Sequence, residues 1–192
     1  PALRDVLVEA GVIAEPGELR ASLLKGRANY LCLQRWIANY ASGLGDPDFA
    51  RLSSAMLLWL PETETGDRSE LNLAPDEWVA WQRFSAQDTD CLVKQNRYVR
   101  EGTCFLLRAR KSAESAHILV VNHALLLADL AAGGNAIPEF DHLVIDEAHN
   151  LCNPEPRTAV ERALTEQLVQ IAAEGRKFGL WLLLSTQRPT KI

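Results

Sequence analysis

Two adjacent carboxylates, Asp146 and Glu147, follow an apolar run at residues 143–145 and carry the clearest chemical signal in the sequence. At a nucleotide-hydrolysing site, the first acid of such a pair binds Mg²⁺ and the second polarises the water that attacks the γ-phosphate. The alternative is a buried strand that simply ends in acidic loop residues, because Asp and Glu are disfavoured inside strands. Ala148 and His149 complete the letters D-E-A-H, so the pattern favours the hydrolase site, with Asp146 as the Mg²⁺ ligand.

Three apolar runs predict the strands that position these acids, at residues 118–121, 143–145 and 180–184. Continuous apolar runs suit strands buried on both faces of a parallel sheet. Helices expected at 124–132 and 157–175 separate the runs, which indicates a parallel sheet of the α/β class. Ligands bind such sheets beyond the carboxyl ends of the strands. The polar residues expected at that edge are Asn122, His123, Asp146, Glu147, Thr186, Gln187 and Arg188.

The first half of the chain has mainly helical periodicity, and residues 18–24 are weakly helical. Residues 62–70 are polar and contain Gly, which predicts an exposed loop. Trp78, Trp81 and Phe84 stand at helical spacing and favour core packing over stacking on single-stranded bases. Apolar residues at helical spacing predict helices over residues 1–10, 30–40, 48–60, 76–84 and 103–116.

The composition is that of an ordinary globular chain, with 192 residues, 47% hydrophobic and 23% charged. A net charge of −5 excludes a general basic coat for nucleic acid, although a local groove can still be basic. No apolar run has transmembrane length and the N-terminus has no signal-peptide pattern, so we expect a cytoplasmic location. The first residue is not Met, which predicts that the chain is a piece of a longer protein.

Three ordered segments carry a family resemblance: residues 24–32 (LKGRANYLC), 118–126 (ILVVNHALL) and 142–150 (HLVIDEAHN). Together they resemble the DinG-like branch of the XPD-type superfamily 2 DNA helicases over residues 1–151. The resemblance implies ATP and Mg²⁺ as ligands and single-stranded or forked DNA as the partner of a monomeric motor. It also implies that His149 couples ATP hydrolysis to movement.

In fold, the resemblance implies a fragment of a P-loop-type ATPase motor domain that carries a mainly helical insert of the iron–sulfur type. Residues 1–31 would belong to the motor, residues 32–104 would form the insert, and residues 105–192 would supply the ATPase core. The basic residues near the insert would contact DNA phosphates. These residues are Lys25, Arg27, Arg97 and Arg100.

Cysteines are part of the same resemblance, because the family's insert holds a [4Fe–4S] cluster with four of them. Cys32 matches the first ligand, and Cys91 and Cys104 match the second and fourth. The third is expected near Asn96, where this chain has no Cys, and Asn is a poor iron ligand compared with a thiolate. Three thiolates would hold a labile or partial cluster, and Cys152 is expected to lie too far away to substitute.

A second resemblance covers the C-terminal segment, about residues 142–192, where a strand ending in Thr-Gln-Arg-Pro is similar to the HerA/FtsK-type ATPases. That group consists of hexameric DNA translocases, and the similarity would make Gln187 the sensor of the γ-phosphate. The two resemblances meet at residues 144–151, which indicates either a natural fusion or a chimera.

A phosphate-binding loop of the pattern Gly-x-x-x-x-Gly-Lys-Ser/Thr is absent from the sequence, although the acidic pair requires one nearby. In DinG-like helicases this loop precedes the segment equivalent to residue 1, so the isolated chain should bind ATP weakly or not at all. Three functions remain: a DinG-like helicase fragment, a HerA-like translocase, or a catalytically dead module that binds DNA or senses redox state.

Overall fold

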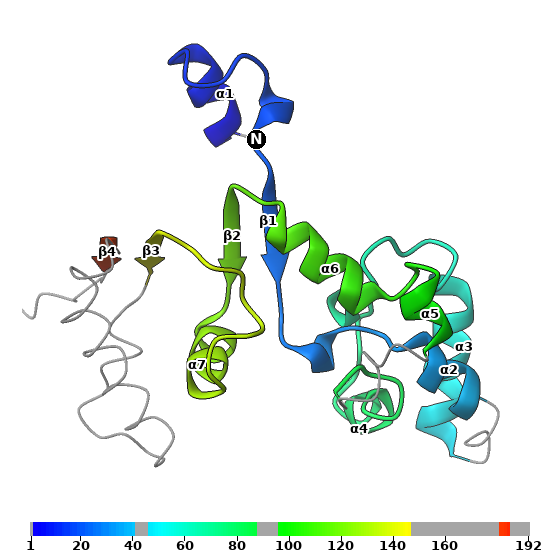
Figure 1. The fold of residues 1–192 in the computed structure, drawn as a ribbon. Helices are drawn as coiled ribbons and strands as arrows, with labels where there is room; N and C mark the ends of the chain where they lie inside the picture. Colours follow the sequence, from blue (N-terminus) through cyan, green and yellow to red (C-terminus); the bar gives the residue numbers. More distant parts are fainter. Residues whose placement is uncertain (1, 41–45, 88–95, 147–180, 185–192) are drawn as a thin grey trace, which may run out of the picture. The chain divides into compact units, whose positions relative to one another are not determined.

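The computed structural model describes residues 2–40, 46–87, 96–146 and 181–184 (Figure 1). The chain divides into two compact units, residues 1–121 and residues 122–192. Helices and parallel strand pairs are present in the described residues, which confirms the predicted α/β class. The described strands form two two-stranded parallel sheets, one in each unit, and the prediction that they belong to one continuous sheet stays a prediction.

The sheet of the first unit pairs β1 (Ala21–Leu24) with β2 (Ile118–Val121) in parallel. The helix α6 (Phe105–Glu114) packs against β1, as Figure 1 shows. The expectation of a weak helix over residues 18–24 is wrong, because hydrogen bonding to a distant strand overrides weak local propensity. The expected burial of β2 on both faces is also not observed, since Val120 is 53% exposed.

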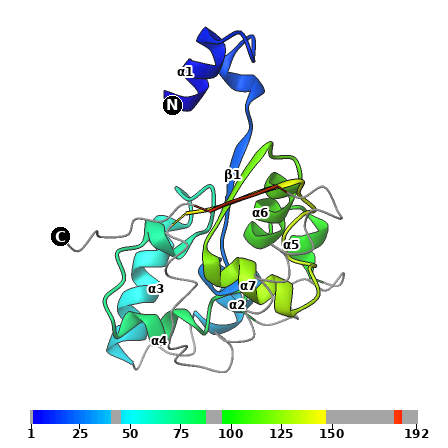
Figure 2. The same cartoon turned by 90° about the vertical axis from the view of Figure 1, so that its left-hand side faces the viewer.

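Among the described residues the first unit has five further α-helices, and all but α5 lie where hydrophobic spacing predicts them. Asp46 begins α3 by accepting hydrogen bonds from the backbone N–H groups of Asp48 and Phe49. Figures 1 and 2 both show α3 and α4 next to each other. The bounds are α1 (Ala2–Glu9), α2 (Leu33–Asn39), α3 (Pro47–Trp59), α4 (Glu77–Trp81) and α5 (Arg97–Arg100).

Aromatic side chains fill the core of residues 32–104, which we call the insert. The Phe84 ring lies 5.0 Å from that of Trp36 and 4.9 Å from that of Phe49, between ring centroids. Trp81 and Phe84 are fully buried, as their spacing predicts. Trp78 is 47% exposed with the Arg68 guanidinium 4.1 Å from its ring, so the prediction that it packs in the core is wrong. A five-residue helix has only one face to bury, and Trp78 lies on the other.

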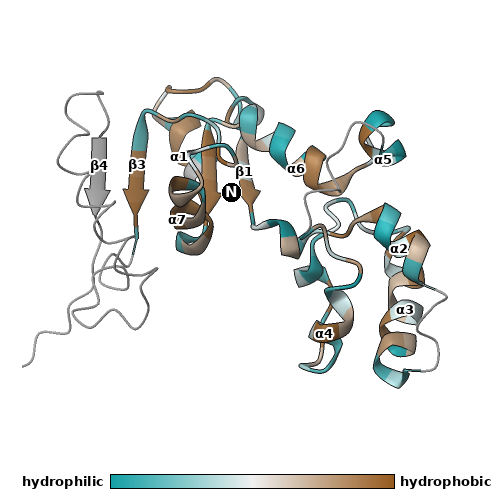
Figure 3. Cartoon of the chain, turned by 60° about the horizontal axis from the view of Figure 1, so that its bottom comes forward, coloured by the Kyte–Doolittle hydropathy of each residue, from teal (hydrophilic) through white to brown (hydrophobic). Residues whose placement is uncertain are grey.

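The second unit contains α7 (His123–Ala131), β3 (His142–Ile145) and β4 (Trp181–Leu184). β3 and β4 are parallel, and Ile145 stands opposite Leu184. These elements confirm the predicted helix and both predicted strands, and Figure 3 shows β3 as hydrophobic after its first residue. The helix expected at 157–175 lies outside the described residues. None of the described helices is long and apolar enough to cross a membrane.

Candidate functional site

The candidate Mg²⁺ ligand, Asp146, is the first residue after β3 and is exposed. The last residue of the strand, Ile145, is only 2% exposed. Asp146 therefore lies at the point where the chain passes from the buried strand end to solvent. An exposed carboxylate at the carboxyl end of a parallel strand suits a hydrated divalent cation, because Mg²⁺ prefers oxygen ligands and retains several waters.

Glu147, His149 and Gln187 lie outside the described residues. Parallel pairing places the ends of β3 and β4 at the same edge of their sheet, and Gln187 comes three positions after Leu184 in the sequence. The pairing therefore agrees with the order of residues that the sequence predicts for this edge. The roles of Asp146, Glu147, His149 and Gln187 stay predictions.

The residue that follows β2, Asn122, has a structural role as a helix cap. Asn122 follows β2 and caps α7, since its Oδ1 accepts a hydrogen bond of 2.8 Å from the backbone N–H of Leu125. His123 is the first residue of α7. Since β2 and β3 belong to different units, the prediction that their ends meet at one edge stays a prediction.

Two of the predicted cluster cysteines, Cys32 and Cys104, are buried in one small core cluster with Tyr30, Ala86 and Leu106. Each stands at the position before a helix, Cys32 before α2 and Cys104 before α6. Burial raises the pKa of the Cys104 thiol, and the nearby Cys32 raises it further. Backbone N–H groups at the start of α6 lower this pKa, but the net shift is upward. Cys91 lies outside the described residues.

Asn96 occupies the position where the family's third cysteine is expected. It is 4% exposed, and its Oδ1 accepts a hydrogen bond of 3.0 Å from the backbone N–H of Tyr98, which caps α5. Across the described ranges, no three His, Cys, Asp or Glu side chains come close enough to share a metal ion. The sequence offers three thiols at the expected positions and an amide at the remaining one, a poor fit to a complete [4Fe–4S] cluster held by four thiolates.

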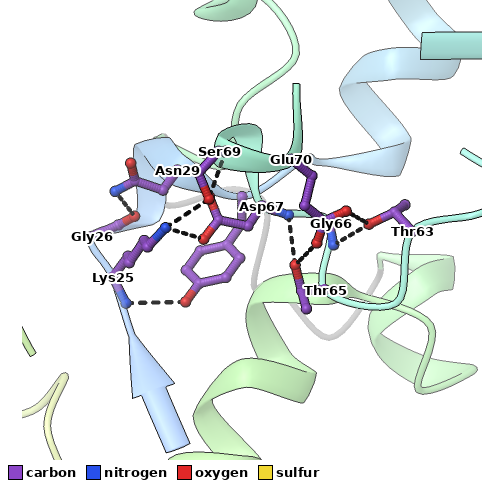
Figure 4. A network of polar contacts seen from close by, with 10 residues as sticks. Lys25, Gly26, Asn29, Thr63, Thr65, Gly66, Asp67, Ser69 and Glu70 are labelled. Atoms are coloured by element: carbon purple, nitrogen blue, oxygen red, sulfur yellow. Dashed lines mark hydrogen bonds and ion pairs between the residues drawn. The ribbon is translucent and has the colours of Figure 1, made fainter. Parts of the chain in front are cut away.

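Lys25, a predicted DNA contact, is half-buried and bonded to the loop at residues 63–70 (Figure 4). Its Nζ lies 2.5 Å from Oδ2 of Asp67 and donates a hydrogen bond of 2.9 Å to Oγ of Ser69. Its backbone N–H donates to the Tyr30 hydroxyl at 3.0 Å. We call these four residues the Lys25 joint, because they fasten the end of β1 to the loop at residues 63–70 of the insert.

The loop beside the joint has its own hydrogen bonds (Figure 4). The Glu70 carboxylate accepts from Nε1 of Trp59 at 2.9 Å, from Oγ1 of Thr63 at 2.6 Å and from Oγ1 of Thr65. Slight burial raises the pKa of Glu70, but these three hydrogen bonds outweigh it and leave the pKa below its ordinary value of 4.5. At Tyr30, burial raises the pKa of the phenol, and the Asp67 carboxylate adds to the shift.

The expected exposed loop at residues 62–70 is therefore partly wrong, because Asp67 is only 7% exposed and Gly66 is also buried. Asp67 is the site residue that the sequence pattern does not reveal. A signal was present in the run Thr63-x-Thr65-Gly66-Asp67, since closely spaced hydroxyl and carboxyl side chains often bond their own backbone.

The other predicted DNA contacts differ in their surroundings. Arg97 is paired with Glu101 at 2.8 Å. Arg27 and Arg100 form no salt bridge with any residue in the part of the chain that the structure describes. Arg100 is exposed and Arg27 is half-buried, and the contacts of the predicted basic residues with DNA phosphates stay predictions.

An α/β chain in which a parallel strand ends in an exposed acid belongs to the class in which ligands bind at the carboxyl ends of strands. Comparison with known proteins narrows this class. No family model matches the chain. The chain is 35% identical over 159 residues to the ATP-dependent DNA helicase YoaA of Escherichia coli, which covers 80% of this chain and 24% of that protein.

Two further relatives carry the name DinG, one as an exonuclease and one as a helicase. The chain is 31% identical over 153 residues to the 3'-5' exonuclease DinG of Bacillus subtilis, covering 80% of this chain and 15% of that protein. It is 35% identical over 167 residues to the ATP-dependent helicase DinG of Mycobacterium tuberculosis, covering 77% and 24%. The chain is homologous to a segment of the DinG-like helicases, which confirms the resemblance carried by its sequence motifs, and it spans about a quarter or less of these relatives.

Proposed function

We propose that this chain is part of the motor of an ATP-dependent DNA helicase. The observation that carries the proposal is the homology over about four-fifths of the chain to proteins named as ATP-dependent helicases, one of them as a DNA helicase. The parallel strand β3 with Asp146 at its carboxyl end supports it independently, because such an edge is where a motor domain binds its nucleotide.

In this proposal Asp146 holds Mg²⁺, Glu147 polarises the attacking water and His149 passes the effect of hydrolysis to the rest of the motor. Gln187 senses the γ-phosphate from the neighbouring strand. The sequence has no phosphate-binding loop of its own, so the acidic pair would act on ATP held by a loop from elsewhere in the full-length protein. Motor residues would comprise 1–31 and 105–192, interrupted by the insert.

The DNA substrate would be single-stranded or forked, bound by a monomer, and the protein would work in the cytoplasm. Arg27 and Arg100 are the better candidates for phosphate contacts, because Lys25 and Arg97 are already paired with acids. An incomplete set of thiols leaves a full iron–sulfur cluster out of this proposal.

The proposal is tested by ATP hydrolysis in the full-length protein that contains this chain, with and without single-stranded DNA. Glu147→Gln should lower turnover by about 100-fold or more, as removal of a water-activating base does. The matched control is Asp141→Asn, which changes an exposed acid directly before the opposite end of β3 and should leave turnover unchanged. Equal turnover in the Glu147 variant and the parent protein would refute the assignment.

A HerA-like translocase is the second candidate, favoured by the parallel pairing of β3 with β4 just ahead of Gln187. Light scattering after size-exclusion chromatography separates the two, because a hexamer supports the translocase and a monomer supports the DinG-like motor. A DNA-binding or redox-sensing module without catalysis would bind DNA and hydrolyse no ATP in either the parent or the Glu147→Gln protein.

A further inference from the structure

We infer that the insert of this chain holds its shape through its own core and its polar contacts with the motor residues, and that Asn96 acts as a helix cap where DinG-like proteins have a cluster ligand. A metal clip is needed to fix a segment whose core is too small to do so. Three observations support the inference that core packing and polar contacts fix the shape of this insert without a metal cluster.

The first observation is the size of the insert's core. Phe49, Leu52, Met56 and Phe84 are each 0% exposed, and Trp81 is 1% exposed. Their rings and chains come from α3, α4 and the turn after α4, so the core ties together elements that are separate in the sequence. A core sealed from water to this degree stabilises its elements without a bound group.

The second observation is the number of bonds between the insert and the residues before it. In the Lys25 joint, Asp67 and Ser69 hold the Lys25 ammonium (Figure 4). Nε1 of Trp81 donates a hydrogen bond of 2.7 Å to the carbonyl of Ala28, close to the joint in sequence. The backbone of Leu31 donates to the carbonyl of Gly66 at 2.9 Å. These contacts fix the insert at several points, which is the structural task of a cluster.

The third observation is the use of position 96. The Asn96 carboxamide is buried, and its oxygen accepts a hydrogen bond from the backbone N–H of Tyr98, so it caps the start of α5. Tyr98, whose backbone N–H the Asn96 side chain binds, packs against the small core that contains Cys32 and Cys104, so the helix that Asn96 caps borders that core. A carboxamide there supplies no thiolate, and the local backbone depends on its cap.

The inference is tested on the whole chain, purified anaerobically and reconstituted with ferrous iron and sulfide. Iron and sulfide are then counted, and thermal unfolding is followed by tryptophan fluorescence before and after a chelator. We expect well under one complete cluster per chain and a melting temperature that the chelator leaves unchanged. A complete cluster of about four iron and four sulfide per chain, whose removal lowers the melting temperature and which Cys32→Ser abolishes, would overturn the inference.

Two variants at position 96 separate capping from ligation. Asn96→Cys should lose the cap, so that the iron-free variant melts below the parent, and should gain iron and sulfide toward about four of each. Asn96→Asp keeps a capping oxygen and should match the parent in both readouts. If Asn96→Cys binds no more iron than the parent, position 96 is not at the cluster site and the inference fails.

If Asn96→Cys does not fold, the iron content of the parent chain and the change of its melting temperature on adding the chelator still test the inference. Neither readout depends on ATP hydrolysis, so the result is independent of whether the proposed helicase function is correct.

Discussion

Gly66 gives the sharpest test of how the insert is packed. Its φ is +65°, in the left-handed region that side chains disfavour. Its backbone N–H donates to Oγ1 of Thr63 at 2.8 Å and its carbonyl accepts from Leu31, so the turn cannot relax without losing hydrogen bonds. A Cβ added at Gly66 would lie 2.2 Å from Cγ of Phe105, a separation that no real contact allows.

Gly66→Ala therefore combines two costs. The left-handed backbone costs about 1–2 kcal/mol for an L side chain. Forcing the Phe105 ring aside is overpacking of a tight contact, which typically costs about 1–3 kcal/mol. Together the substitution should lower the free energy of unfolding by about 2–5 kcal/mol, a large part of the stability of an ordinary domain.

Gly102→Ala is the matched control, since its φ is +72° and an added Cβ would meet nothing within 4 Å. It should cost only the backbone term, about 1–2 kcal/mol. Urea denaturation followed by tryptophan fluorescence measures both variants, because Trp36, Trp59, Trp78 and Trp81 all lie in the insert. Equal losses in the two variants would show that the Phe105 contact contributes nothing, and the packing argument would be wrong.

Three further predictions concern charged groups. In a double-mutant cycle of Lys25→Met and Asp67→Asn, the coupling free energy should be about 1–3 kcal/mol, between the values for exposed and buried pairs; additive losses would contradict the joint. The pKa of Glu70 is lower folded than unfolded, so its stabilisation is present at neutral pH and is lost as the pH falls below 4.5. Urea midpoints of Glu70→Gln should accordingly depend less on pH in that range. Arg27→Ala and Arg100→Ala should each weaken binding of single-stranded DNA and reduce its salt dependence, as measured by fluorescence anisotropy.

Strands made of continuous apolar runs could be predicted, whereas β1 could not. The strand β3 is three apolar residues preceded by one polar residue, a run that favours a strand, although Val144 is 65% exposed and only Ile145 is buried. β1 consists of Ala21, Ser22, Leu23 and Leu24, a mixture without strong preference for strand or helix. It forms a strand because it pairs with β2, which lies far along the chain. The local sequence of β1 does not indicate this pairing partner.

The candidate site divides in the same way. Asp146 could be placed at a strand end because the strand and the acid are adjacent in sequence. Asp67 was not predicted as a site residue, because the local run at residues 63–67 indicates a turn and not its ion pair with Lys25, which comes from a different part of the chain. The exposure of Trp78 could not be predicted either. Helical spacing shows which residues share a helix face, but not that the helix is only five residues long and buries only part of that face.

The Lys25 joint connects the end of β1 to the insert at a defined place. β1 and β2 run parallel, so Lys25 lies just beyond the carboxyl end of the pair, the edge at which α/β sheets bind ligands. Asp67 and Ser69 hold this lysine from within the insert, and the pair is largely shielded from water, which keeps it strong. A shift of β1 at that edge would thus pull directly on the loop of residues 63–70. The structure gives Lys25 a positioning contact with the insert, and its contact with DNA stays a prediction.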